Sequence, residues 1–175
     1  MSTQADDYRD ILRRDFNAFA ERAFRELNPG TRFLPNWHVD AMAGALDQFR
    51  LGRIRRLGLY VPPRHLKSHL ASIALPAFWL GHDPAAQIMC ISYGLELASK
   101  LSRDCMRLMQ SRFYQALFDT RLSPLKQSAA EFTTTRGGYR LASSIGGPVT
   151  GRGADAIIID DPIKPEDAQS EATRR

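Results

Sequence analysis

The chain has 175 residues, of which 43% are hydrophobic and 25% are charged, and its formal net charge is +5 at pH 7. These proportions are typical of a globular protein with a sizeable core and exclude a disordered chain. No apolar run is long enough to span a membrane, and the first residues lack the basic and apolar stretches of a secretory signal. Cys90 and Cys105 are too few for a disulfide framework or a metal cluster, so we expect buried thiols in a reducing compartment.

The positive charge is concentrated in two places. Four arginines fall within residues 50–56, and Lys100, Arg103 and Arg107 recur at helical spacing. Basic faces of this kind suit a polyanion such as nucleic acid. Solvated surface charge explains any single one of these residues equally well.

The amino-terminal part predicts two helices. Apolar side chains recur every three or four residues from Tyr8 to Leu27, which indicates one amphipathic helix ended by the Asn-Pro-Gly of residues 28–30. We therefore treat residues 1–30 as an amino-terminal helical segment. A second helix is expected over residues 39–51, capped near Asn36.

Three short apolar runs predict buried β-strands, at residues 57–61, 87–93 and 156–159. Helical patterns follow the first two runs, and Pro76 predicts a kink in the earlier helix. Strands that alternate with helices predict an α/β fold. We expect a parallel sheet covered by helices on both faces, with its ligand at the carboxyl ends of the strands.

A β-hairpin is predicted from residues 131–135 and 139–143. Gly137 lies in the Gly-Gly corner between them and can supply the positive φ that such a turn needs. The following segment, residues 144–153, holds four glycines and one proline, so we expect a mobile or closely packed loop.

The most informative segment is VPPRHLKS, residues 61–68, which lies between a strand-like and a helix-like run. A phosphate-binding loop has the pattern G-x-x-x-x-G-K-[ST], and here Val61 and Leu66 replace both glycines. Backbone N–H groups from Arg64 to Ser68 still form an anion nest at a helix amino terminus. Leu66 costs about 1–2 kcal/mol if its position demands left-handed geometry. By itself the segment also fits a proline-ended strand followed by a surface Lys-Ser pair.

Two adjacent carboxylates, Asp160 and Asp161, follow the apolar run of residues 156–159. In a nucleotide hydrolase, the first acid at such a strand end joins the magnesium shell and the second positions or deprotonates the attacking water. Adjacent acids before a proline also occur at ordinary turns. The combination with Lys67 and Ser68 favours nucleotide triphosphate chemistry.

As a set, these motifs resemble the amino-terminal part of the large terminase subunit of tailed bacteriophages and related prophages. That subunit is the ATPase motor that drives DNA into a capsid. The resemblance runs from about Phe33 to the end of the chain. The segments that carry it are LPNWH (34–38), PPRHLKS (62–68), SY (92–93), RGGYRLA (136–142), GG (146–147), TGRG (150–153) and IIIDDP (157–162).

The resemblance implies a role for each residue of the loop and of the acidic strand end. The phosphates of ATP would be bound by Arg64, His65, Leu66, Lys67 and Ser68. Lys67 would be the charge clamp, Ser68 and Asp160 would hold Mg²⁺, and Asp161 would be the catalytic base. Many terminases have glutamate in place of Asp161, and the aspartate is one methylene shorter.

Two further roles, for three residues, follow from the same resemblance. Trp37 and His38 fall where related motors contact adenine, although an ordinary buried aromatic explains them equally well. Arg64 would be a catalytic residue that senses the γ-phosphate of the ATP bound to its own chain. The alternative is an arginine that simply faces solvent.

The family's fold is a P-loop NTPase-type parallel sheet covered by helices. By resemblance, residues 31–175 are a partial ATPase domain that is incomplete at its carboxyl end and lacks the nuclease domain. ATP and Mg²⁺ are the implied cofactors. Double-stranded DNA, a portal protein and a small terminase subunit are the implied partners. We expect a homo-oligomer when complete, in the cytoplasm of a bacterial host and not in a membrane.

Two alternatives remain open at the level of the sequence. A helicase-like DNA translocase shares both nucleotide motifs and the basic faces. A catalytically inactive, truncated remnant that only binds nucleotide or DNA would keep the motifs without turnover.

Overall fold

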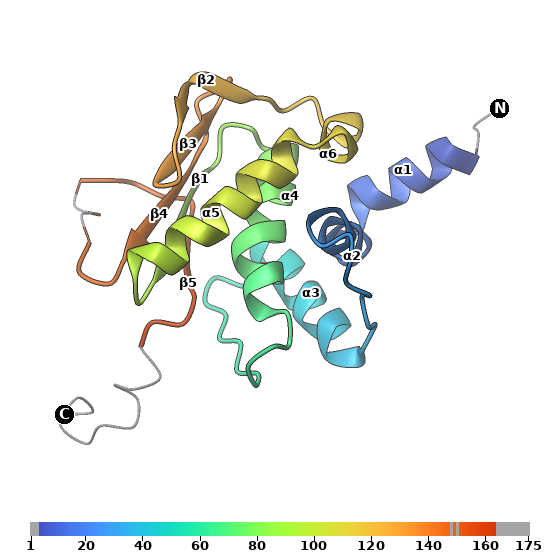
Figure 1. The fold of residues 1–175 in the computed structure, drawn as a ribbon, viewed down its shortest axis with the longest axis horizontal. Coiled ribbons are helices and arrows are strands. Elements are labelled where there is room, and N and C mark those ends of the chain that lie inside the picture. Colours follow the sequence, from blue (N-terminus) through green and yellow to red (C-terminus); the bar gives the residue numbers. More distant parts are fainter. Residues whose placement is uncertain (1–3, 148, 150, 164–175) are drawn as a thin grey trace.

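The computed structural model describes residues 4–147, 149 and 151–163, which form helices packed against a β-sheet (Figure 1). The helices are α1 (Gln4–Arg14), α2 (Phe16–Leu27), α3 (Trp37–Arg50), the π-helix η1 (His69–Ala74), α4 (Leu75–His82), α5 (Leu95–Gln110) and α6 (Arg112–Leu117). The strands are β1 (Gln87–Ser92), β2 (Leu122–Gln127), β3 (Glu131–Thr134), β4 (Tyr139–Ser144) and β5 (Ala156–Ile159).

The sheet has five strands in the order β2-β3-β4-β1-β5 and is mixed. Strands β4, β1 and β5 are parallel, whereas β2 and β3 are antiparallel to their neighbours. The α/β prediction is confirmed, but the prediction of a parallel sheet holds only for three strands. The predicted β3–β4 hairpin makes one antiparallel pair, and β2, which the sequence did not predict, adds another.

The helices cover one face of the sheet in the part of the chain that the structure describes. Helix α5 packs on β1 and β4, and η1, α4 and α2 pack on α5 in turn (Figure 1). On the opposite face, Met89, Tyr139 and Leu141 form a small cluster covered by Val149 and Ala154 of the glycine-rich loop. The prediction that helices cover both faces is therefore wrong for these residues.

Residues 57–61 form no strand, contrary to the prediction. Their burial still alternates: Leu57, Leu59 and Val61 pack against the core, and Tyr60 is exposed. Alternation of this kind records which side of an extended chain faces the core. Strand pairing also requires a partner at hydrogen-bonding distance, and no strand pairs with this segment in the described structure.

The amino-terminal segment is two helices and not the single helix predicted. Asp15 separates α1 from α2 and caps α2, because its carboxylate accepts a hydrogen bond from the N–H of Ala18 at 3.0 Å. Phe16 and Phe19 of α2 then pack on Phe78, with ring centroids 5.4 and 5.1 Å apart. The apolar periodicity continues through the break, which is why it did not reveal two helices.

Several other predicted elements are confirmed to within a few residues. Helix α3 begins directly after Asn36, and α5, β1 and β5 lie where the apolar patterns indicated. In the β3–β4 turn, Gly137 has a φ of 88°. A Cβ at Gly138 would lie 2.4 Å from the Pro84 carbonyl oxygen, so only glycine fits there.

The irregularity expected at Pro76 is a π-helical turn. Proline has no N–H to donate to the Ser72 carbonyl four residues earlier, and the N–H of Leu75 bonds to Leu70, five residues back. The Ser72 carbonyl instead accepts a hydrogen bond from Arg140 Nη2 at 3.0 Å. Within the described residues, none of the helices has both the length and the apolar character needed to cross a bilayer.

Candidate functional site

The loop before Lys67 has an alternating backbone conformation. Arg64 and Leu66 have φ values of 65° and 62°, whereas His65 between them does not have a positive φ. Successive N–H groups in a turn with left-handed residues can point toward one spot, which is the geometry of an anion-binding nest. Leu66 thus adopts the left-handed geometry considered from the sequence, at a cost of about 1–2 kcal/mol.

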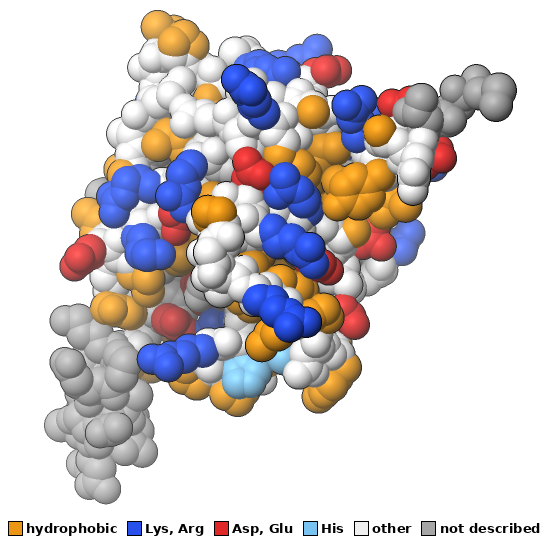
Figure 2. All heavy atoms as spheres, turned by 45° about the vertical axis from the view of Figure 1, so that its right-hand side comes forward, with side chains coloured by type: hydrophobic (Ala, Val, Ile, Leu, Met, Phe, Trp, Pro, Cys, Tyr) orange, Lys and Arg blue, Asp and Glu red, His pale blue; other side chains and the backbone are white. Residues whose placement is uncertain are grey.

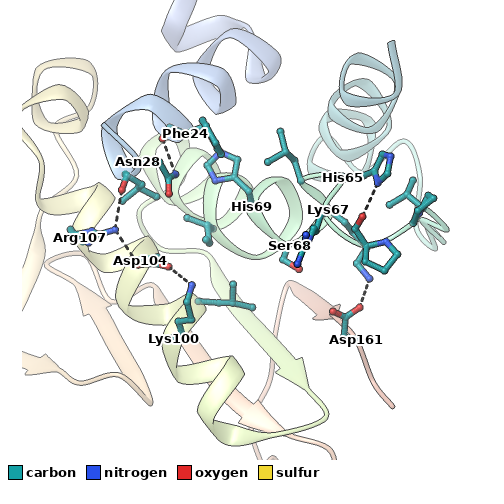
Figure 3. A pocket seen from close by; sticks show the side chains of 18 residues that line it. Phe24, Asn28, His65, Lys67, Ser68, His69, Lys100, Asp104, Arg107 and Asp161 are labelled. Atoms are coloured by element: carbon teal, nitrogen blue, oxygen red, sulfur yellow. Dashed lines mark hydrogen bonds and ion pairs between the residues drawn. The ribbon is translucent and has the colours of Figure 1, made fainter. Parts of the chain in front are cut away.

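Lys67 lies at the start of the helix that follows this loop and faces two carboxylates. Its Nζ is 3.5 Å from Asp160 Oδ1. It makes a shorter ion pair with Asp161 Oδ1 (Figure 3). Partial burial lowers the pKa of Lys67, but the hydrogen bonds and charges of Asp161 and Asp160 outweigh burial, so the pKa is raised overall. Lys67 is therefore a cation at neutral pH.

The two carboxylates have different surroundings. Asp160 is 3% exposed, and its Oδ2 accepts a hydrogen bond from Ser72 Oγ at 2.9 Å. Asp161 is half-exposed, has a φ of 49°, and its carbonyl accepts a hydrogen bond from the N–H of Tyr93 at 2.9 Å. Asp160 is therefore held in place, whereas the Asp161 side chain can change partner.

A cavity of about 430 Å³ lies beside the loop (Figure 3). Its lining comes from the loop, from η1, from the end of α2, and from Lys100, Asp104 and Arg107 of α5. Asp104 pairs with both Lys100, at 3.2 Å, and Arg107, at 3.3 Å. Basic side chains outnumber acidic ones in this lining, so the cavity favours an anionic ligand.

A second cavity, of about 520 Å³, lies between the segment of residues 55–60 and β5. Its walls are largely apolar and include Phe49 and Ile158. Lys67 and Asp161 line both cavities. Their ion pair therefore stands where the two cavities meet.

Trp37 and His38 lie near the loop but outside both cavities. The His38 ring is 5.0 Å from the His65 ring, and His65 Nδ1 lies 2.9 Å from the Pro63 carbonyl oxygen. Trp37 is 78% exposed. The structure thus connects His38 to the loop through His65 and leaves Trp37 on the surface, so the buried-aromatic explanation of Trp37 is wrong.

Ser72, Arg140 and His69 surround the site and were not identified from the sequence. His69 Nε2 lies 2.9 Å from the Ala20 carbonyl oxygen, and burial lowers the pKa of His69. Ser72 follows Ser68 by four residues, a spacing that places both on one side of a helix and was a usable signal. Arg140 lies within the segment RGGYRLA of residues 136–142, but nothing in that segment indicated that its side chain would contact Ser72.

Among the described residues, no group of three or more His, Cys, Asp or Glu side chains is arranged to hold a metal ion. The Ser68 hydroxyl and the Asp160 carboxylate are nevertheless oxygen ligands suited to Mg²⁺. That ion is usually held by one or two carboxylates together with substrate phosphates. Comparison of the chain with family models, with curated proteins and with solved structures gives no match.

Proposed function

We propose that this chain is the nucleotide-binding part of a phage terminase large subunit, with a P-loop-type ATPase site that powers DNA packaging. One observation supports this function above the others. A loop with positive φ at Arg64 and Leu66 ends at Lys67, at a helix amino terminus, and faces Asp160 and Asp161. Phosphoryl transfer requires this combination of an anion nest, an ammonium and an acidic strand end.

In this function, the N–H groups of residues 64–68 and the positive end of the helix bind the β- and γ-phosphates of ATP. Lys67 neutralises part of the phosphate charge. Ser68 and Asp160 would hold Mg²⁺, which supplies further charge neutralisation to the phosphates when it is bound. Asp160 suits this role because its carboxylate is already fixed by Ser72.

Binding of ATP then changes the partner of Lys67. Without ligand, the ammonium is paired with Asp161. A phosphate oxygen would replace this carboxylate and leave Asp161 free to orient and deprotonate the attacking water. Arg64 is exposed beside the nest, and in this function it would contact the γ-phosphate. The exchange explains why a catalytic base lies next to the phosphate clamp.

The proposed partners are double-stranded DNA, a portal protein and a small terminase subunit, in a homo-oligomer within the cytoplasm of a bacterial host. Lys and Arg side chains are prominent on the face shown in Figure 2. Lys100, Arg103 and Arg107 are exposed on α5. A basic surface supports the DNA part of the proposal, since phosphate contacts dominate non-specific DNA binding.

Replacing Lys67 with alanine tests the function directly. Lys67→Ala removes the ammonium from the nest, so we expect binding of a fluorescent ATP analogue to be lost, as measured by anisotropy. Lys126→Ala, which removes a lysine that lines neither cavity, should bind like the parent. If Lys67→Ala binds as tightly as the parent, the assignment of the loop is wrong. Steady-state ATP hydrolysis with and without DNA then distinguishes a motor from a protein that only binds nucleotide.

A further inference from the structure

Arg140 is a buried cation in the middle of the fold. It lies on β4, its side chain is 0% exposed, and only Nη2 has a hydrogen-bond partner among the described residues. A buried guanidinium is costly unless neighbouring acceptors or negative charge compensate for it. Its position therefore requires an explanation beyond packing.

The hydrogen-bond partner of Arg140 among the described residues is a backbone carbonyl of η1. Pro76 cannot donate to the Ser72 carbonyl, and Arg140 Nη2 donates to that oxygen at 3.0 Å. Arg140 thus contacts the backbone of η1 close to the turn where the π-helix meets α4. It also fixes the backbone of Ser72.

Ser72 carries this connection to the acidic strand end. It is fully buried, and its Oγ donates to Asp160 Oδ2 at 2.9 Å. The other carboxylate oxygen, Oδ1, faces Lys67 Nζ at 3.5 Å. Hydrogen bonds therefore connect Arg140 of β4 to Ser72 of η1, and Ser72 to Asp160, which directly follows β5.

The charges of Arg140 and Asp160 also act in the same region. Burial raises the pKa of the Cys90 thiol, while Arg140 lowers it and Asp160 raises it. Both charges thus lie close enough to one thiol to influence it.

We infer that Ser72 and Arg140 are positioning residues that orient the Asp160 carboxylate toward the magnesium-bound nucleotide, a role that rests on the proposed function. Ser72 holds one oxygen, so the other is directed at the site. Arg140 holds the backbone of Ser72 through its carbonyl. Outer partners of this type tune metal affinity without touching the metal or the substrate.

Magnesium dependence of nucleotide binding tests this inference. For Ser72→Ala, we expect the Mg²⁺ concentration at half-maximal binding of a fluorescent ATP analogue to rise about tenfold. Binding measured in EDTA should not change. Ser102→Ala is the matched control, because it removes an equally buried hydroxyl that has no hydrogen-bond partner in the described structure. If Ser72→Ala and Ser102→Ala have the same Mg²⁺ requirement, the inference is overturned.

Arg140→Lys tests the other half of the connection. Lysine keeps the charge but lacks the planar fork that reaches the Ser72 carbonyl, so we expect a Mg²⁺ requirement between those of the parent and Ser72→Ala. A requirement equal to that of the parent would exclude a role for Arg140 in positioning.

A measurement without nucleotide separates this inference from the proposed function. Unfolding of Ser72→Ala, Asp160→Asn and the double variant should be non-additive, because the two side chains share a hydrogen bond. Additive effects would show that the contact is not formed, whatever the function. If the effects are non-additive but the parent protein binds no ATP analogue with Mg²⁺, the proposed function fails and the positioning role fails with it.

Discussion

Leu66 shows how a glycine position can be filled by a bulky residue. Its φ of 62° is the geometry that the second glycine of a phosphate-binding loop provides at no cost. The Leu66 side chain packs against the hydrophobic core, and its carbonyl accepts the N–H of Leu70 at 2.9 Å. These contacts offset the strain and let the nest form without glycine.

Two substitutions at Leu66 separate strain from packing. Leu66→Ala loses the side-chain contacts but keeps the strained backbone, whereas Leu66→Gly loses the same contacts and relieves the strain. We expect Leu66→Gly to be more stable than Leu66→Ala by about 1 kcal/mol, as measured by urea unfolding. At ordinary positions glycine is the less stable of the two, so the reverse order would show that the loop is not left-handed at this residue.

Asp161 is paired with Lys67, the ammonium that would bind phosphate in the proposed function. Asp161→Asn removes the negative charge from this ion pair, so we expect ATP to bind as tightly as in the parent or a few-fold tighter. Turnover should fall at least a hundredfold, because an amide cannot accept the proton of the attacking water. Binding is followed by anisotropy and turnover by phosphate release. Unchanged hydrolysis would assign the catalytic base to another residue.

At the scale of elements, one ion cluster ties the glycine-rich loop to the sheet. Glu131 at the start of β3 accepts two hydrogen bonds from Arg152, at 2.9 and 3.0 Å, and pairs with Lys126 at 2.8 Å. Arg152 also lies over the Tyr139 ring at 5.9 Å. The loop is thus held over the sheet face opposite the helices.

The stability provided by this cluster should depend on pH in the acid range. Burial raises the pKa of Glu131, but the hydrogen bonds and charges of Arg152 and Lys126 outweigh burial and lower it below the ordinary value of 4.5. The ionised Glu131 carboxylate therefore stabilises the folded state fully above pH 4.5. This stabilisation is lost as pH falls through the lowered pKa that Glu131 has in the folded protein. Arg152→Gln should be less stable than the parent at pH 7, and the difference should shrink below pH 4.5.

Chemical unfolding at several pH values measures this difference. Arg9→Gln is the control, because the Arg9–Asp6 pair is exposed on a helix and contributes little. A stability difference for Arg152→Gln that does not change with pH would mean that Glu131 is not stabilised by Arg152.

At the scale of the whole molecule, strand β5 is an open edge of the sheet in the described structure. Ile157 and Ile159 are 56% and 57% exposed and point away from the helical layer. Residues 157–159 line the second cavity, and no strand pairs with the outer side of β5 in the described structure. Such an edge promotes association between chains.

We expect the purified protein to bind a dye for apolar surface and to associate as its concentration rises. Ile157→Lys should reduce both effects, because a lysine on an edge strand opposes pairing with another chain. Leu125→Lys is the comparison: Leu125 is 94% exposed on β2, at the opposite edge of the sheet. Sedimentation velocity measures the association. If Leu125→Lys reduces association as much as Ile157→Lys, the effect is not specific to β5.

Local patterns in the sequence predicted most of the helices and strands and the residues that are central to the candidate site. The periodicity of apolar residues predicted α3, α5, β1, β5 and the β3–β4 hairpin, because this signal reports which side of a segment is buried. The loop ending at Lys67 and the acids at Asp160 and Asp161 were also identified, since each lies beside its own strand or helix. These features depend on neighbours in the chain.

Features that depend on residues far apart in the chain could be read only from the fold. Examples are the presence of β2 and its antiparallel pairing with β3, the break at Asp15 and the unpaired state of residues 57–61. They follow from packing that periodicity does not record. The roles of Ser72 and Arg140 could likewise be read only from the fold, because each side chain makes its hydrogen bond with a residue far away in the chain. A buried hydrogen bond stabilises only when both groups meet at the right distance, and the fold alone brings them together.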